Sequence, residues 1–230
     1  MAGARQRAGP PLSGTTGLLG GSFNPAHGGH RRITLFTLAA LGLDEAWWLV
    51  SPGNPLKPRA GMAPLGQRLA SARRHSRRAP IRATAIEREL GTRYTVDTLR
   101  ALVRRYPRRR FVWIMGADNL AQFHRWRNWR AIARGMPIAG IARPGYDALA
   151  HASPAMAWLR RYRRRAARFD TRSGWSAPAL VFLRFDPDKR SATAIRQADP
   201  AWADPERASR VACAPIRDAV THRTIPADAA

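Results

Sequence analysis

Cysteine is almost absent from this chain of 230 residues, since Cys213 is the only one. A single cysteine excludes a framework of disulfide bonds within the chain and favours a reducing compartment. Long apolar runs are missing too, because no stretch of 18 apolar residues occurs, and we therefore expect no membrane-spanning helix. Residues 1–16 are basic but lack the apolar centre of a secretory signal. The sequence thus predicts a flexible basic tail at residues 1–16 and a cytoplasmic location.

Lysine and acidic residues are scarce as well. Lys57 and Lys189 are the only lysines among 40 basic residues, and 15 acidic residues leave a formal net charge of +25. Such an excess is typical of proteins that bind nucleic acids or other anions. However, arginine beside abundant alanine, glycine and proline is also what a GC-rich genome produces, and the arginine runs at 104–110 and 160–168 suit solvated helix faces. A basic nucleic-acid-binding protein stays open as an alternative, although composition carries little specificity.

Apolar residues make up 45% of the chain, which suits one ordinary domain with a sizeable core. Short apolar runs alternate with amphipathic stretches. The expected strands cover residues 17–23, 45–50, 81–87, 111–115, 136–142 and 180–185. The expected helices cover residues 28–41, 65–76, 95–106, 158–168 and 191–197. This alternation predicts an α/β fold, a Rossmann-like, doubly wound parallel sheet with helices on both faces, over residues 17–198. Residues 199–230 are interpreted as an extension whose order the sequence does not define.

The most specific segment follows the first expected strand and reads GGSFNPAHGGH over residues 20–30. Gly20 and Gly21 let a nucleotide approach the backbone closely, because they carry no Cβ. His27 and His30 share one face at the start of the next helix, where free N–H groups and the helix dipole favour an anion. A His-x-x-His pair can also supply two zinc ligands, but no neighbouring Cys, Asp or Glu completes such a shell. The segment therefore predicts a polyphosphate site and no metal site.

Three suggestive segments follow the ends of expected strands, at residues 20–30, 116–118 and 186–196. In open parallel sheets the ligand crevice lies at the carboxyl ends of the strands, near the point where the strand order reverses. We therefore expect these three segments to meet in one site.

The first of them resembles the signature of the HxGH nucleotidylyltransferases, and residues 17–197 as a whole resemble the bacterial nicotinate-nucleotide adenylyltransferase family. The family has Asp where this chain has Asn24. Residues 211–225 match the closing helix of the family poorly, which leaves the packing of that part open. The resemblance implies the nucleotidylyltransferase type of the Rossmann-like fold.

The resemblance assigns the mononucleotide to segments that read SPGNPLKP, RYTVDTL and RPGY and to a tryptophan that stacks on the pyridine ring. The implicated residues are Asn54, Lys57, Thr95, Trp126 and Arg143. Taken by itself, Trp126 could equally be a core residue, the commoner fate of an isolated tryptophan. Arg143 could equally lie on the surface, because arginine is so abundant in this chain.

The resemblance assigns ATP to the first segment, to the GADNL segment and to SATAIR, which resembles the ISSTxIR motif that opens a helix against the phosphates. The implicated residues are Gly20, Gly21, Ser22, Phe23, His27, His30, Gly116, Asp118, Ser191, Thr193 and Arg196. Asp118, Ser191 and Thr193 could also be plain helix caps. Arg196 follows them at helical spacing, which favours a phosphate clamp.

The implied reaction joins the AMP part of ATP to nicotinate mononucleotide and gives deamido-NAD and pyrophosphate, a step of NAD biosynthesis. The mononucleotide phosphate is already an anionic nucleophile, so alignment and charge stabilisation suffice. His27, His30 and Arg196 are the expected catalytic residues, and Mg²⁺ is expected to arrive with ATP. The alternative within the class is another HxGH enzyme, a pantetheine-phosphate adenylyltransferase or a cytidylyltransferase. We expect ATP and nicotinate mononucleotide as partners and no nucleic acid, and we leave a homo-oligomer open.

Overall fold

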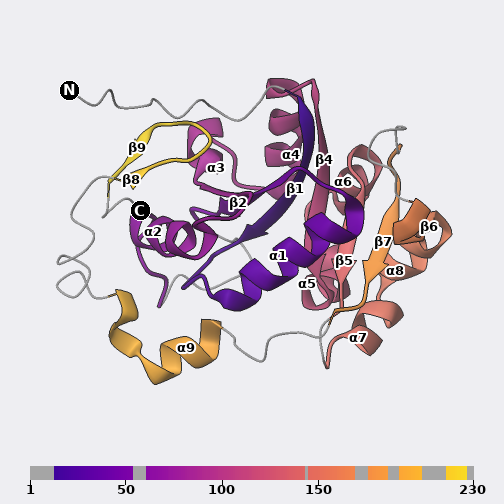
Figure 1. Cartoon of the computed structure of the whole chain (residues 1–230). Coiled ribbons are helices and arrows are strands. Elements are labelled where there is room, and N and C mark those ends of the chain that lie inside the picture. The colour runs from indigo at the N-terminus through magenta and orange to yellow at the C-terminus, as the bar shows by residue number, and fades with distance from the viewer. Residues whose placement is uncertain are drawn as a thin grey trace.

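The computed structural model of the chain describes residues 13–53, 61–142, 145–168, 176–185, 192–203 and 216–226. In this part of the chain a seven-stranded sheet lies between two layers of helices (Figure 1). Every neighbouring pair of its strands is parallel. The predicted fold class, a Rossmann-like α/β fold, is therefore confirmed.

The sheet has the order β3-β2-β1-β4-β5-β7-β6. Its strands are β1 (Gly14–Gly21), β2 (Glu45–Val50), β3 (Ile81–Thr84), β4 (Arg109–Gly116), β5 (Ile138–Ile141), β6 (Arg163–Arg164) and β7 (Leu180–Leu183). The chain runs outward from β1 to β3 and then returns to place β4 on the other side of β1. The strand order thus reverses between β1 and β4, where a ligand crevice is expected at the carboxyl ends.

The helices cover both faces of the sheet. They are α1 (Gly28–Leu41), α2 (Leu65–Ser76), α3 (Ile86–Leu90), α4 (Thr95–Arg105), α5 (Ala117–Gln122), α6 (Trp129–Gly135), α7 (Asp147–Ala152), α8 (Pro154–Leu159) and α9 (Ala192–Ala198), with short 3-10 turns that include η1 (Phe123–Arg125). In the described ranges no helix is both long enough and apolar enough to cross a lipid bilayer.

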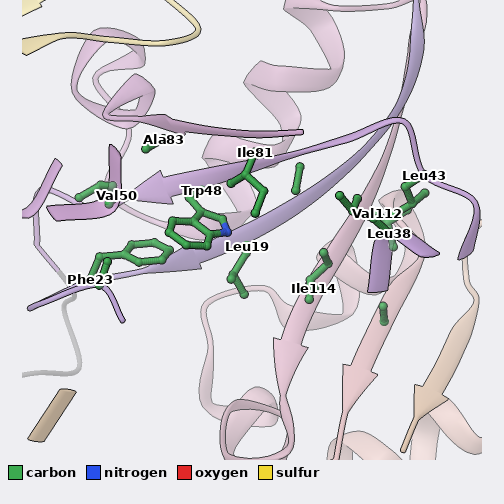
Figure 2. Packing of buried hydrophobic residues seen from close by; sticks show 14 of the residues in the cluster. Leu19, Phe23, Leu38, Leu43, Trp48, Val50, Ile81, Ala83, Val112 and Ile114 are labelled. Atoms are coloured by element: carbon green, nitrogen blue, oxygen red, sulfur yellow. The ribbon is translucent and has the colours of Figure 1, made fainter. Parts of the chain in front are cut away.

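Two apolar cores form, one on each face of the sheet. The first packs α1 and α2 on the sheet, and the second packs α3, α4, α5, α6 and α8 on the opposite face. Figure 2 shows side chains of the first core. Trp47 and Trp48 of β2 enter different cores, because successive side chains of a strand point to opposite faces. Both buried indoles find acceptors: Trp47 Nε1 donates to Glu45 (2.8 Å) and Trp48 Nε1 donates to Thr34 (2.9 Å).

Several element boundaries differ from the prediction. β1 begins at Gly14, inside the predicted tail, because the amide and hydroxyl of Thr15 both donate to Asp44 (2.7 and 2.8 Å). The expected strand at 81–87 ends at Thr84, and its last residues form α3. The helix predicted at 158–168 is wrong, since α8 ends at Leu159. The arginine run that follows has no apolar stripe to bury, and packing of such a stripe is what stabilises most helices in proteins.

A C-terminal hairpin covers the edge of the sheet at β3. Its strands β8 (Ile216–Arg217) and β9 (Thr224–Ile225) pair antiparallel, and Figure 1 shows them beside α2 and α3. Ile216 and Ile225 join the first core, whereas Val220 joins the second. Residues 216–226, which the sequence left without defined order, thus pack on both faces of the domain. Residues 1–12 of the predicted tail lie outside the described residues.

Candidate active site

The turn after β1 is anchored in the core by Phe23. Its side chain is only 2% exposed, its φ is 48°, and its ring stacks on Trp48 with centroids 5.1 Å apart (Figure 2). Gly20 lies so close to Trp113 that an added Cβ would come within 2.5 Å of the indole. Phe23 was predicted to bind ATP, but its side chain is buried in the core beneath the turn and packs on Trp48. Contact with a ligand is thus left to its backbone.

His27 and His30 open α1, as predicted, and each bonds to the backbone through Nδ1. His27 Nδ1 accepts from the Gly29 amide (3.1 Å), and His30 Nδ1 accepts from the His27 amide (3.2 Å). The two ring centroids are 4.0 Å apart. A nitrogen that accepts such a bond carries no hydrogen, so each neutral ring carries its hydrogen on Nε2. The backbone thus fixes two N–H donors at a helix N-terminus, where anions are favoured.

Asn24 uses both ends of its amide, which explains why an asparagine fits at a position where the family has Asp. Its Nδ2 donates to the Gly61 carbonyl (2.8 Å), and its Oδ1 accepts from the Ala63 amide (3.1 Å). A carboxylate could make only the second of these bonds. Asn24 therefore ties the turn after β1 to the segment that leads into α2.

Arg196 reaches the same turn from the far end of the sequence. Its guanidinium donates to the Asn24 carbonyl (2.6 Å) and to the Thr193 hydroxyl (3.3 Å). The structure thus brings the turn after β1 and α9 together, as the sequence analysis expected. Ser191 lies outside the described residues.

A cavity of about 350 Å³ opens at the carboxyl ends of β1, β2 and β4. This volume falls within the range of small-molecule sites. Its lining residues come from the end of β1 and the turn after it, the end of β2, α3, the start of α4, β4, α5 and the segment around η1: Gly20, Gly21, Ser22, Leu49, Ser51, Gly53, Glu87, Arg93, Tyr94, Thr95, Trp113, Asn119, Arg125, Trp126 and Arg127. Thr95 and Trp126, both predicted for the mononucleotide, therefore share one cavity with the predicted glycine turn.

Arginines give this cavity a positive wall. Arg93, Arg125 and Arg127 line it and are all exposed. The Arg127 guanidinium lies 4.5 Å from the centroid of the Tyr94 ring, a cation–π contact across two segments of the wall. These residues could not be singled out from the sequence, because arginine is too abundant here to mark a site. Such a wall attracts an anionic ligand.

Trp126 both lines the cavity and packs on other rings. It is partly buried, and its indole meets Trp113 and Phe123 edge to face, with centroids 6.4 and 5.5 Å apart. The two interpretations offered by the sequence, ring stacking and core packing, are therefore not exclusive. One part of the side chain supports the second core while another faces the cavity.

Replacement of Trp126 by alanine should therefore affect both binding and folding. If the resemblance is right, the KM for the mononucleotide should rise about ten- to a hundredfold through lost stacking, with the KM for the nucleoside triphosphate unchanged. Loss of the two aromatic contacts should lower the free energy of unfolding by about 1–3 kcal/mol. Trp126→Phe keeps a ring and should recover most of the affinity. A destabilised alanine variant with an unchanged mononucleotide KM would show that Trp126 only packs in the core and does not stack on the ligand.

Glu87 is a cavity residue that the sequence analysis missed. Its carboxylate accepts from the Thr98 hydroxyl (3.1 Å). Withdrawal from water raises the pKa of Glu87 to about 7, although hydrogen bonds from Thr98 and Ser51 act in the opposite direction. This carboxyl group therefore changes its charge near neutral pH inside a cavity that three arginines also line. The only available signal was an acidic residue at the end of an expected strand.

Arg68 is a second missed residue, and it holds the cavity loops together. It is 1% exposed, and its guanidinium donates to the carbonyls of Ala63 (2.7 Å), Ser22 (2.9 Å) and Ser51 (2.6 Å). Burial lowers the pKa of Arg68 to about 10, so the side chain stays charged at neutral pH. Its signal in the sequence was a charged residue on the apolar stripe of α2, between Leu65 and Leu69.

The remaining predicted residues fall into two groups. Asp118 lies in the first turn of α5, and its carboxylate folds over Gly116, where an added Cβ would collide with it. Asn119 beside it lines the cavity. Asn54, Lys57 and Arg143 lie outside the described residues.

In the part of the chain that the structure covers, no three His, Cys, Asp or Glu side chains are grouped so that they could hold a metal ion.

The parallel Rossmann-like sheet with a histidine pair at the switch point is consistent with the nucleotidylyltransferase class. Residues 18–198 match the family described as cytidylyltransferase-like. A probable nicotinate-nucleotide adenylyltransferase from Erythrobacter litoralis is 69% identical over 210 residues, which cover 91% of this chain and 94% of the relative. A protein of the same name from Parvibaculum lavamentivorans is 53% identical over 181 residues, covering 79% and 90% of the two chains. The chain therefore belongs to the nicotinate-nucleotide adenylyltransferase family.

The fold also resembles a solved structure of Plasmodium falciparum nicotinic acid mononucleotide adenylyltransferase complexed with NaAD. The TM-score is 0.61 at 12% sequence identity, and the match covers 86% of this chain and 97% of the other. At this identity the likeness concerns the fold alone.

Proposed function

We propose that this protein transfers AMP from ATP to the phosphate of nicotinate mononucleotide, producing deamido-NAD and pyrophosphate in NAD biosynthesis. The observation that carries this proposal is the pair of histidines whose Nε2–H donors are fixed at the start of α1. The turn that carries them follows β1. The last two glycines of β1 line a cavity that Trp126 also lines. An anion-binding helix end beside an aromatic-walled cavity suits a mononucleotide and a polyphosphate held side by side.

In this reaction an oxygen of the mononucleotide phosphate attacks the α-phosphorus of ATP. The new bond joins that oxygen to the α-phosphorus, and the bond from the α-phosphorus to the oxygen that leads to the β-phosphorus breaks. Pyrophosphate leaves with the electron pair of that bond. The nucleophile is already an anion, so the protein needs no general base, and its task is to align the two phosphates and to stabilise developing charge.

The ATP side of the site combines the histidine pair with Arg196 and Asp118. His27 and His30 donate from Nε2 to the phosphates and stabilise the negative charge that develops on the leaving pyrophosphate. Arg196, held against the turn by its bond to the Asn24 carbonyl, binds the β- and γ-phosphates. Asp118, which follows β4 and lies against Gly116, accepts hydrogen bonds from the ribose. The substrate is the magnesium complex of ATP, in which phosphates and water supply most of the ligands of the ion.

The mononucleotide side combines a ring contact with anion binding. Trp126 stacks on the pyridine ring, and the N-terminal amides of α4, which begins at Thr95, receive the ring carboxylate. Arg93, Arg125 and Arg127 attract the doubly anionic substrate. By resemblance, Asn54, Lys57 and Arg143 contribute to binding of its phosphate and base.

The preference for the acid over the amide tests this assignment. We expect kcat/KM for nicotinate mononucleotide to exceed that for nicotinamide mononucleotide by at least about tenfold, because loss of one charge-assisted contact costs about 1.5 kcal/mol or more. Purified protein is assayed with ATP and each mononucleotide in parallel, with phosphopantetheine, and with CTP in place of ATP, as controls. Equal kcat/KM for acid and amide would overturn the proposed base preference. Turnover of a control substrate alone would reassign the enzyme within its class.

A further inference from the structure

The C-terminal hairpin is fastened to the edge of the sheet on the side of the cavity. The Ala219 amide donates to the Ala83 carbonyl of β3 (3.4 Å), and the Arg73 guanidinium of α2 donates to the Arg217 carbonyl (2.6 Å). Figure 1 shows the hairpin beside α3, the helix that follows β3. Because β3 is an edge strand, the hairpin caps polar backbone groups that would otherwise face solvent.

Asp218 is the centre of this attachment. It is 1% exposed, and its two carboxylate oxygens serve different segments. Oδ1 accepts from the amides of Val220 (2.8 Å) and Thr221 (2.9 Å) and so shapes the hairpin turn. Oδ2 accepts from the Thr84 hydroxyl (3.0 Å) and the Ala85 amide (2.6 Å) at the end of β3. One buried carboxylate therefore joins the hairpin to the residues that lead into α3.

The bonds continue from Asp218 to the wall of the cavity. The Thr84 hydroxyl also accepts from the Ile86 amide at the start of α3 (3.1 Å). Glu87, the next residue, lines the cavity, and its carbonyl accepts from the Thr92 amide (3.1 Å). Arg93, Tyr94 and Thr95 follow directly and line the same cavity. A shift of the end of β3 would thus move Glu87 and the start of α4 together.

We propose that Asp218 is a positioning residue for the mononucleotide cavity, which makes the C-terminal hairpin part of the machinery that binds this substrate. The proposal rests on the proposed function for the identity of the substrate. The ATP side of the site, built from the turn after β1 and α9, has no bond to Asp218 among the contacts of the described residues. The hairpin should therefore affect one substrate and spare the other.

The test compares Asp218→Asn with Asp44→Asn. Both aspartates accept from a threonine hydroxyl and a backbone amide, but Asp44 lies before β2, at the opposite end of the sheet from the cavity. An asparagine keeps one accepting oxygen and loses the other. We expect Asp218→Asn to raise the KM for nicotinate mononucleotide about tenfold and to leave the KM for ATP within about twofold. Asp44→Asn should change neither KM.

A second readout needs no substrate. Amide hydrogen exchange, measured by mass spectrometry on the unliganded full chain, should be faster over residues 84–95 in Asp218→Asn and unchanged there in Asp44→Asn. If Asp218→Asn does not fold, Thr84→Val removes one of the four bonds to Asp218, together with the acceptor of the Ile86 amide, and should shift both readouts in the same direction. Unchanged exchange in a folded variant would overturn the inference whatever the substrate is. An inactive unaltered protein would instead contradict only the proposed function.

Discussion

Replacement of His27 by asparagine is expected to lower kcat about 100-fold or more and to leave the unfolding temperature close to that of the unaltered protein. Asparagine is among the best helix N-cap residues and can accept from the Gly29 amide, as the imidazole Nδ1 does. Its shorter side chain places no N–H donor at the position of Nε2, so the expected stabilisation of the transition state is lost. Steady-state kinetics and thermal unfolding measured on the same preparation separate the two roles of the histidine.

Two further variants serve as controls. His27→Ala removes the cap as well, so it should lose the same factor in kcat and, in addition, about 1 kcal/mol of stability. His30→Ala removes the acceptor for the His27 amide and should also lower kcat about 100-fold or more. If His27→Asn turned over at the rate of the unaltered protein, the histidine would be a helix cap only, and the assignment of the site would be wrong.

Replacement of Arg68 by alanine is expected to lower the free energy of unfolding by about 3–5 kcal/mol. The change leaves a cavity and deprives the carbonyls of Ser22, Ser51 and Ala63 of their donor. Because two of these carbonyls belong to loops that line the active-site cavity, the fraction that stays folded should also bind the mononucleotide more weakly. Denaturant unfolding followed by tryptophan fluorescence measures the loss.

Arg74 provides the matched control for this experiment, because it lies on the same helix but is exposed. Arg74→Ala should change stability by no more than about 0.5 kcal/mol, as is usual for surface positions. Arg68→Lys keeps the charge but cannot span three carbonyls, so it should fall between the two alanine variants. Equal stability of Arg68→Ala and Arg74→Ala would show that the buried guanidinium does not hold these loops.

The fold could be predicted because its signals are local. The helix expected at residues 28–41 has those bounds in the structure, with His27 as its N-cap and Gly42, at a φ of 60°, as its C-cap. The strand at 45–50 also has its predicted bounds. A short apolar run that ends at turn residues is typical of a buried strand. The helix predicted at 158–168 was wrong beyond Leu159. The length and charge of that segment resemble a helix, but it has no apolar stripe that could pack on the domain.

The site could be predicted only where a motif is contiguous. His27, His30 and Arg196 were identified from short motifs, and the structure brings them to one turn, although their roles toward substrate stay predictions. Arg68, Glu87 and Asp218 carry no such motif. Arg68 bonds to Ser22, 46 positions away, and Asp218 bonds to Thr84, 134 positions away. A contact of that kind follows from how the sheet edge and the hairpin pack, and no local pattern encodes it.

The most direct test of the account follows the phosphorus atoms of ATP. Purified protein is incubated with nicotinate mononucleotide and with ATP labelled either at the α- or at the γ-phosphate, and the products are separated. The account predicts that the α label appears in deamido-NAD and that the γ label appears in pyrophosphate, in equal amounts and only when the mononucleotide is present. Transfer of the γ label to the mononucleotide, or release of labelled phosphate without a dinucleotide product, would contradict it.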